Sequence, residues 1–260
     1  MNTYDNVTSI ATIADKIVVL DLEFLPDEKL YARYVKLDPR PARIRWPFKR
    51  VVAATVMTLS VEHGLLQVEH FKTFTGSDEG RLVSLLFAYL NERNSYRLVT
   101  WGGLNTDIPV LRIAAMEHGL KLPLQLRPQA RDRRGWMHLD LCKEMQAGEY
   151  VHLSEVATRL SIPTKFAGCA ASIPELIRQG NWCAVGWVCE ADVVTLACLV
   201  ASQLATTSGL ISAEAAHHDI LSFVRQLRGQ APYNSYLGNV QHRLRARIKA
   251  ELQRWIARVA

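Results

Sequence analysis

The segment from Lys16 to Glu23, KIVVLDLE, restricts the possible folds more than any other part of the sequence. Its short run of β-branched apolar residues predicts a buried strand, and this strand ends in two acids. Because side chains alternate along a strand, Asp21 and Glu23 project from the same face, a short distance apart. We therefore expect a buried strand that delivers two carboxylates to one edge of a sheet.

Two carboxylates held that close repel each other unless a positive charge lies between them. Hard divalent cations such as Mg²⁺ or Mn²⁺ prefer oxygen ligands and would supply that charge. For an Asp-x-Glu pair alone, the alternative is a strand end whose two acids simply face solvent. The pair therefore points to a metal site only in combination with further acids.

The rest of the chain alternates between strand and helix patterns. Val51–Ser60 and Leu65–Phe71 predict a hairpin that turns at His63-Gly64. Strands are expected early and helices later, which predicts a mixed α/β domain. The other expected elements are a helix capped by Ser77, a strand over Arg97–Trp101, a helix from Asp107 to Gly119, short helices over Val151–Leu160 and Ile173–Gln179, and a long apolar helix over Gly186–Ala205.

Two further acids lie at helix positions. Asp107 follows two glycines and precedes Pro109, where capping of the helix is the ordinary alternative to metal binding. Asp192 lies early in the long apolar helix, where a buried carboxylate needs a positive partner because an unpaired buried charge is costly. Two metal ions would be such a partner. We expect the neighbouring Glu190 to be the solvated acid of this helix.

Five stretches resemble, in sequence order, the predicted 3′–5′ exonucleases related to the proofreading domain of family B DNA polymerases. They are VVLDLEFLPDE, TWGGLNTDIPVL, HLDLCKEM, LSEVATRLSIPTKF and CEADVVTLACLV, within about residues 17–205. The resemblance implies an α/β fold of the DEDD exonuclease type, a ribonuclease H-like mixed sheet flanked by helices. The family also has an acid in the HLDL stretch, but we expect His138 and Asp140 to form structural hydrogen bonds.

The resemblance assigns the family's four metal-binding, catalytic acids to Asp21, Glu23, Asp107 and Asp192. They would hold two divalent cations, Mg²⁺ or Mn²⁺, about 3.5–4 Å apart, and nucleotides would be removed from 3′ ends. One ion would help to activate the attacking water, and the other would stabilise the departing 3′-oxygen. A preference for DNA with single-stranded ends follows from the polymerase-like resemblance alone, because no residue is assigned to sensing a 2′-hydroxyl.

The sequence departs from the family at the positions that orient water and stack on substrate. A tyrosine-type member has Tyr four residues before the last Asp, where this chain has Val188, and a histidine-type member has His where this chain has Trp187. The second motif usually has asparagine-glycine and an aromatic residue before its Asp, whereas this chain has Gly102-Gly103 and Thr106. We therefore expect a slow enzyme.

The formal net charge of +6 points towards a polyanionic partner, here nucleic acid. Residues 26–50 are expected to form a basic loop, and a second Arg-rich connection covers residues 127–134. The alternative is a pair of solvated loops on a basic protein. The candidates for contacts with backbone phosphates are Arg43, Arg45, Arg131 and Arg133.

No secretory signal is expected, because the first residues lack a basic region followed by an apolar stretch. The sequence contains no run of about 18 uninterrupted apolar residues, so no membrane span is expected. The five cysteines contain no C-x-x-C pair and are expected to be reduced thiols of a cytoplasmic protein. Residues 1–210 are expected to form the exonuclease domain, followed by a basic helical appendage over residues 211–260.

Two functions of different kinds are compatible with these patterns. The first is a metal-dependent 3′–5′ exonuclease, which the four retained acids favour. The second is a catalytically weakened nucleic-acid-binding or regulatory subunit that retains the exonuclease fold, which Val188 and the altered second motif favour. Metal bound by the four acids would distinguish the enzyme from the binding subunit.

Overall fold

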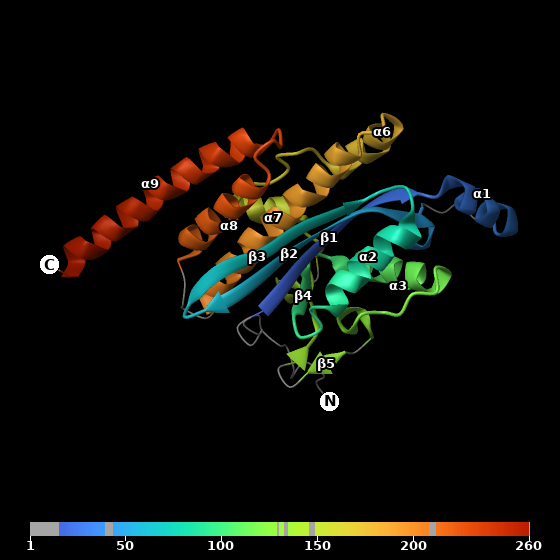
Figure 1. The fold of residues 1–260 in the computed structure, drawn as a ribbon, viewed down its shortest axis with the longest axis horizontal. Coiled ribbons are helices and arrows are strands. Elements are labelled where there is room, and N and C mark those ends of the chain that lie inside the picture. Colours follow the sequence, from blue (N-terminus) through green and yellow to red (C-terminus); the bar gives the residue numbers. More distant parts are fainter. Residues whose placement is uncertain are drawn as a thin grey trace.

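A mixed five-stranded sheet runs through the centre of the protein, with helices packed on both of its faces (Figure 1). The computed structural model describes residues 16–39, 44–128, 130–132, 135–145, 149–207 and 212–259. The strands of this sheet are β1 (Lys16–Pro26), β2 (Lys49–Glu62), β3 (Leu65–Thr75), β4 (Arg97–Thr100) and β7 (His138–Asp140). A separate two-stranded ribbon consists of β5 (Arg131–Asp132) and β6 (Gly135–Trp136).

The order of the strands is β3-β2-β1-β4-β7. β2 pairs antiparallel with both β1 and β3, whereas β4 pairs parallel with both β1 and β7. This arrangement confirms the ribonuclease H-like mixed sheet that the sequence predicts. The predicted hairpin corresponds to β2 and β3, whose turn residues His63 and Gly64 have φ angles of 50° and 76°. Positive φ at both central residues is what a tight two-residue hairpin turn requires.

Alternation of side chains along β1 decides which helices face its two acids. Val18 and Leu20 pack in the core beneath α2 (Glu79–Asn91) and α3 (Asp107–Glu117). Ile17 and Val19 pack on the opposite face, against α7 (Trp182–Thr207). Asp21 and Glu23 continue this second series, so they project towards α7.

Helix α7 is the central element of the layer that covers this face. By length and composition alone its 26 residues are apolar enough to cross a membrane, but 83% of the apolar window is buried inside the protein. α7 contacts β1, β2 and β3 on one side and α8 (Ala213–Leu227) on the other. These contacts are those of a core helix. The shorter helices are α4 (Leu141–Met145), α5 (Leu153–Arg159) and α6 (Ile173–Arg178).

The C-terminal helices extend the same layer. Ile220 and Val224 of α8 belong to the core cluster that contains Val193 of α7. α9 (Asn234–Val259) packs on α8 and then extends away from the rest of the protein (Figure 1). In that extension Leu252 and Ile256 are 55% and 52% exposed.

The segment between β1 and β2 is more regular than the predicted basic loop. It contains helix α1 (Glu28–Leu37) and the single turn of 3-10 helix η2 (Trp46–Phe48). Asp27 caps α1 by accepting a hydrogen bond from the Leu30 amide at 2.9 Å, and the rings of Tyr31 and Phe48 lie 5.3 Å apart. α1 buries none of its residues, although Leu30, Tyr31 and Tyr34 have the spacing of one helical face, so the predicted basic loop overlooked a helix pattern.

Candidate metal centre

Three parallel strands end at the same edge of the sheet, and polar residues lie at each of these ends. β1 carries Asp21 and Glu23, β4 runs into the loop that precedes Asp107, and β7 ends at Asp140. In open α/β sheets, ligands bind in the crevice outside the carboxyl ends of the strands. A ligand site that uses the predicted acids is therefore expected at this edge of the sheet.

Asp21, Glu23 and Asp192 form one compact group of carboxylates. Each contributes an oxygen, and these oxygens lie within 4.8 Å of one another. Glu23 is only 5% exposed, and the side chain of Asp192, from α7, is 15% exposed. Three hard oxygen donors that converge in a shielded position fit Mg²⁺ or Mn²⁺ better than a softer metal.

Asp107 lies beside this group rather than within it. It is the first residue of α3 and is 8% exposed. A side chain at Gly103 would meet its Oδ2 at 3.1 Å, so glycine keeps the carboxylate accessible from the preceding loop. The structure thus brings the four predicted acids into one region, with three converging directly and the fourth adjacent to them.

The acids of this region raise one another's pKa. Burial raises the pKa of Asp21 well above its ordinary range, and the charges of Asp192, Asp107 and Glu23 raise it further. Burial also raises the pKa of Glu23 to about 7, with Asp192 as the next cause. The pKa of Asp107 rises to about 7 through burial and then the charge of Asp140. Such unmet negative charge favours uptake of a cation with release of protons.

An ammonium group that was not among the predicted site residues lies against the carboxylates. Lys165 Nζ donates hydrogen bonds to both oxygens of Asp192, at 2.9 and 2.6 Å. Its φ of 52° lies in the left-handed region that non-glycine residues rarely adopt. Burial lowers the pKa of Lys165, but the charges of Asp192, Asp21 and Glu23 outweigh it and hold this pKa above its ordinary value. The sequence contains Lys165 in IPTKF, but nothing in its spacing indicates the contact with Asp192.

Asp140 holds the loop that leads to Asp107. Its carboxylate accepts hydrogen bonds from the backbone amides of Gly102 at 2.7 Å and Leu104 at 3.0 Å. It is 3% exposed, so these amides supply the hydrogen bonds that water would otherwise donate to the carboxylate. The hydrogen-bonding role expected for this residue matches these contacts, and through them Asp140 positions the second motif.

A second set of contacts fixes the start of the same loop. His138 Nε2 lies 2.8 Å from Thr100 Oγ1. Burial, together with the smaller effect of the positive charges of Arg112 and Lys143, lowers the pKa of His138 to about 3. The imidazole therefore stays neutral. A Cβ at Gly103 would overlap the Thr100 side chain, which explains why glycine occupies this position.

Glu190 is buried, which corrects the expectation that it is the solvated acid of α7. It is 3% exposed. Its Oε1 accepts hydrogen bonds from Thr73 at 2.7 Å and Arg228 at 2.9 Å, and its Oε2 accepts one from Tyr233 at 2.5 Å. Because Arg228 and Tyr233 follow α8, these partners come from a part of the chain that local sequence patterns do not connect to α7.

Val188 is also buried, at 1% exposed. It belongs to a small core cluster with Val52, Ala53 and Ile173. A Cβ at Gly168 would lie 3.3 Å from Val188 Cγ2, so the segment around Gly168 covers this side chain closely. The position where the family carries a water-orienting tyrosine is therefore packed with apolar atoms in this protein.

The predicted phosphate-binding arginines have different surroundings. Arg45 is exposed and directly precedes η2. Arg131 is exposed too, but its guanidinium stacks 3.5 Å from the centroid of the Trp136 ring. Arg43 and Arg133 lie outside the described residues.

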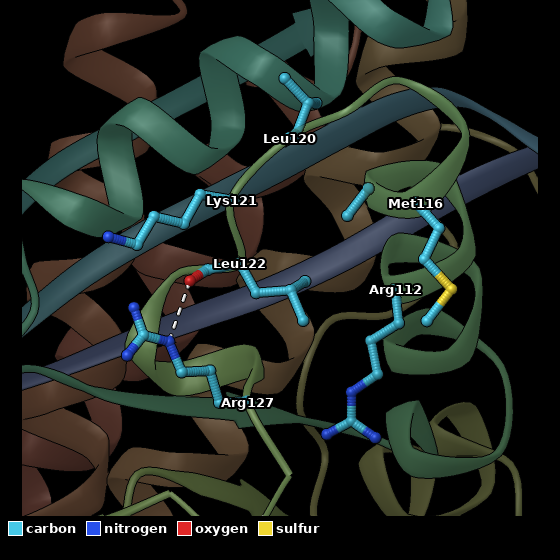
Figure 2. A pocket seen from close by; sticks show the side chains of 7 residues that line it. Arg112, Met116, Leu120, Lys121, Leu122 and Arg127 are labelled. Atoms are coloured by element: carbon cyan, nitrogen blue, oxygen red, sulfur yellow. Dashed lines mark hydrogen bonds between the residues drawn. The ribbon is translucent and has the colours of Figure 1, made fainter.

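A hollow of about 350 Å³ lies beside the second Arg-rich connection (Figure 2). Arg112 and Arg127 donate from Nε to the carbonyls of Leu126 and Leu122, at 2.8 and 3.1 Å. Within the described part of the chain, neither guanidinium pairs with a carboxylate. The hollow contains none of the four acids, and its lining consists of Arg112, Ala115, Met116, Leu120, Lys121, Leu122 and Arg127.

A second group of potential metal ligands consists of Glu79, Glu117 and His118. The guanidinium of Arg50 already neutralises its two acids. Arg50 Nη1 lies 3.0 Å from Glu79 Oε2 and also contacts Glu117. Glu79 accepts a further hydrogen bond from the Val51 amide at 2.7 Å. This cluster joins α2, α3 and β2 as an ion-pair network, whereas the group at Asp21 is the one with excess negative charge.

Comparison with known proteins assigns the chain to a family. The sequence model of the family described as "Predicted 3'-5' exonuclease related to the exonuclease domain of PolB" matches residues 43–239. No curated protein matches the chain. A product-bound structure of exonuclease I is similar at a TM-score of 0.46 and 10% identity, covering 79% of this chain and 47% of that chain.

Two other solved structures are similar at the same level. Exonuclease I of E. coli in complex with a 5cy-dT13 oligonucleotide has a TM-score of 0.46 and 9% identity, covering 82% of this chain and 45% of that chain. The family B DNA polymerase of Pyrobaculum calidifontis has a TM-score of 0.42 and 13% identity, covering 80% of this chain and 29% of that chain. The chain thus spans less than half of the length of each of these three proteins.

Proposed function

The chain belongs to the family of predicted 3′–5′ exonucleases related to the exonuclease domain of PolB, and we propose that it hydrolyses phosphodiester bonds at 3′ ends with divalent metal ions. The observation that carries this proposal is the convergence of Asp21, Glu23 and Asp192, with oxygens within 4.8 Å of one another, next to the buried Asp107. A phosphodiesterase needs negative charge of this kind to hold cations against a phosphate that is itself an anion.

The four acids would hold two divalent cations, Mg²⁺ or Mn²⁺. Such ions lower the pKa of a bound water and stabilise the negative charge that develops on the leaving oxygen. Asp21, Glu23 and Asp192 supply the shared ligands, and Asp107 supplies charge from the start of α3. Asp140 keeps Asp107 in register by holding the amides of the preceding loop.

Cleavage is expected to be slow. Val188 offers no polar atom, and it is packed in the core at the position where the family carries tyrosine. Loss of a positioned acid–base group typically lowers a rate by about 10²–10⁴-fold. The remaining acids still account for a metal-dependent reaction, so a slow nuclease is expected rather than an inactive protein.

The preferred substrate in this proposal is DNA with a single-stranded 3′ end. The net charge of +6 and the exposed Arg45 support a polyanionic substrate. RNA and DNA oligonucleotides labelled at either end, digested with Mg²⁺ or Mn²⁺, distinguish direction and sugar. Shortening from the 3′ end only, faster on DNA, is the expected result, and equal loss from both ends would contradict it.

The acids themselves supply the matched controls. Asp21→Ala should abolish cleavage, and Asp21→Ala/Asp192→Ala should be hardly worse than either single variant, because the ligands act as one unit. Glu62→Ala, at an exposed acid of β2, should leave the rate unchanged. Near-full activity of Asp107→Ala would remove Asp107 from the proposed ligand set.

A nucleic-acid-binding or regulatory subunit is the second candidate, and the buried Val188 favours it. The ammonium of Lys165 against Asp192 favours it too, because a fixed cation can neutralise the acids without metal. Two Mn²⁺ ions bound per chain would support the enzyme. Oligonucleotide binding without any cleavage at saturating metal would support the subunit.

A further inference from the structure

Tyr150 is an exposed aromatic residue that packs against Gly102, in the loop between β4 and Asp107. It is 53% exposed, so much of its surface is open to a ligand. It follows α4, the helix that continues from β7, so it comes from the loop at the carboxyl end of a parallel strand. Each of the three parallel strands therefore leads into a residue of this region.

The ring of Tyr150 rests on the loop that carries Asp107. A Cβ at Gly102 would lie 3.0 Å from its Cε2 and 3.5 Å from its hydroxyl oxygen. Gly102 has a φ of 68°, so a larger residue here would be strained as well as crowded. The phenol end of the ring thus lies over Gly102, one residue before the glycine that faces the Asp107 carboxylate.

The backbone next to Tyr150 is anchored to the sheet edge. The Trp101 indole donates a hydrogen bond to the Val151 carbonyl at 3.0 Å, and the Cys142 thiol lies 3.8 Å from the same oxygen. The ring of His152 stands edge-on to Tyr150, with centroids 5.3 Å apart and an interplanar angle of 84°. The ring is therefore held in place although much of its surface is open.

The surroundings of Tyr150 keep its hydroxyl protonated. Burial raises the pKa of Tyr150, and the charges of Cys142, Asp107, Asp140 and Asp21 raise it further. The phenol therefore stays protonated and uncharged at neutral pH. An uncharged, oriented ring next to a site for a phosphate is suited to contact with a nucleobase.

We propose that Tyr150 is the stacking residue for the unpaired 3′-terminal base. This inference rests on the proposed function and assigns a substrate-binding residue to the same site. Every base has a π-face, so stacking on an aromatic side chain binds a single strand without sequence preference. Gly102 serves this arrangement because the ring occupies the space in which a side chain would lie.

The test compares two DNA oligonucleotides that differ only at the 3′ end. Both carry a 5′ fluorophore and a phosphorothioate as the last linkage, but one ends in thymidine and the other in an abasic tetrahydrofuran nucleotide. Fluorescence anisotropy with Mg²⁺ measures the dissociation constant of each. The wild-type protein should bind the thymidine end about tenfold or more tightly, the effect of one stacked base.

The variants separate stacking from a purely structural role. Tyr150→Ala should bind both oligonucleotides equally, Tyr150→Phe should retain the preference, and Tyr236→Ala, at a 42% exposed tyrosine of α9, should behave like wild type. A preference that persists in Tyr150→Ala would overturn the inference. A Tyr150→Phe protein that loses the preference would overturn it too, because the hydroxyl rather than the ring would then be needed.

Failure of the proposed function gives a different pattern. A protein that never cleaves a 3′ end but discriminates the two oligonucleotides through Tyr150 would disprove the exonuclease and retain the stacking residue. A protein that cleaves 3′ ends without discrimination between them would retain the exonuclease and disprove the stacking residue.

Discussion

Lys165 and Asp192 are joined by two hydrogen bonds, of 2.9 and 2.6 Å, from one ammonium to both oxygens of one carboxylate. Asp192 is also one of the three acids whose oxygens converge on the candidate metal position. The lysine therefore binds the same carboxylate that the metal ions are proposed to use. In the protein without metal, it supplies positive charge that the group otherwise lacks.

Removal of Lys165 should make the protein more dependent on metal. Lys165→Met leaves Asp192 facing Asp21 and Glu23 without a counter-charge. Because the side chain of Lys165 is 40% exposed, we expect a loss of about 1 kcal/mol without metal, or about 2–4 °C in Tm. The shift in Tm caused by Mn²⁺ should be larger than in wild type. Lys121→Met, at a lysine outside the acidic group, is the control, and equal Mn²⁺ shifts in both variants would contradict this role.

The stability of the metal-free protein should fall as pH rises through the acidic range. The pKa values of Glu23 and Asp107 are both about 7 in the folded protein, because burial disfavours their charged forms. In the unfolded chain both groups ionise near pH 4. The folded state therefore holds more protons between about pH 4 and 7, and stability is lost across that window as pH rises.

Thermal melts at about pH 5 and pH 8 in EDTA measure this loss. A Glu23→Gln/Asp107→Asn protein should show a flatter dependence, whereas Glu62→Gln should follow wild type. Saturating Mg²⁺ should raise Tm more at the higher pH, because bound metal takes the place of the protons. A wild-type Tm that rises steadily over this range would contradict the raised pKa values.

Restoring the family tyrosine at Val188 should not speed up cleavage. The valine is 1% exposed and lies within 3.3 Å of the position of a Cβ at Gly168, so a larger side chain has no space. Overpacking of this kind typically costs about 1–3 kcal/mol. Val188→Tyr should therefore melt at lower temperature without a gain in rate. Leu85→Tyr, at a 49% exposed position of α2, is the control for tyrosine in a helix. A stable Val188→Tyr enzyme that is clearly faster would show that the site can open there.

The ion pair between Arg228 and Glu190 should matter more for stability than an ion pair at the surface. Arg228→Met leaves a carboxylate that is 3% exposed without its cation. Breaking a buried pair typically lowers the free energy of unfolding by about 3–5 kcal/mol. Because the Arg228 side chain is 26% exposed, we expect a loss of about 3 kcal/mol or less. Arg178→Met, which breaks an exposed pair with Glu175, should cost at most about 1 kcal/mol. Urea denaturation measures both, and equal losses would contradict the difference.

Binding of nucleic acid should depend on Arg45 more than on Arg131. Arg45 is exposed, whereas the guanidinium of Arg131 stacks on Trp136 at 3.5 Å. Replacing a residue that contacts a phosphate lowers the slope of log K against log salt by about 0.7 for a single strand. Arg45→Gln should show this change, and Arg159→Gln should not. Salt titrations with a single-stranded oligonucleotide measure the slope, and an unchanged slope for Arg45→Gln would assign this arginine to solvated surface.

Local patterns are sufficient to predict the frame of the fold. KIVVLDLE specifies a buried strand, and the two-residue period of a strand puts Asp21 and Glu23 on one face whatever the rest of the chain does. His63-Gly64 specifies the hairpin turn because both residues tolerate positive φ. These features depend on neighbours a few residues away, so they are visible without a structure. Helix α1 is harder to predict, because the helical spacing of Leu30, Tyr31 and Tyr34 lies in a segment rich in prolines and basic residues.

The identity of the partners around the site depends on the packing of the sheet against its helices. Glu190 and Asp192 both lie in an apolar helix, and the sequence does not say which of them meets Arg228 and which meets Lys165. Both contacts join residues far apart in the chain. A strand or a cap is determined by interactions among adjacent residues, whereas the partner of a buried charge is determined by which elements the closed core brings together. Asp192 therefore becomes part of the carboxylate group, and Glu190 part of the core, only once α7 and α8 are packed side by side on the sheet.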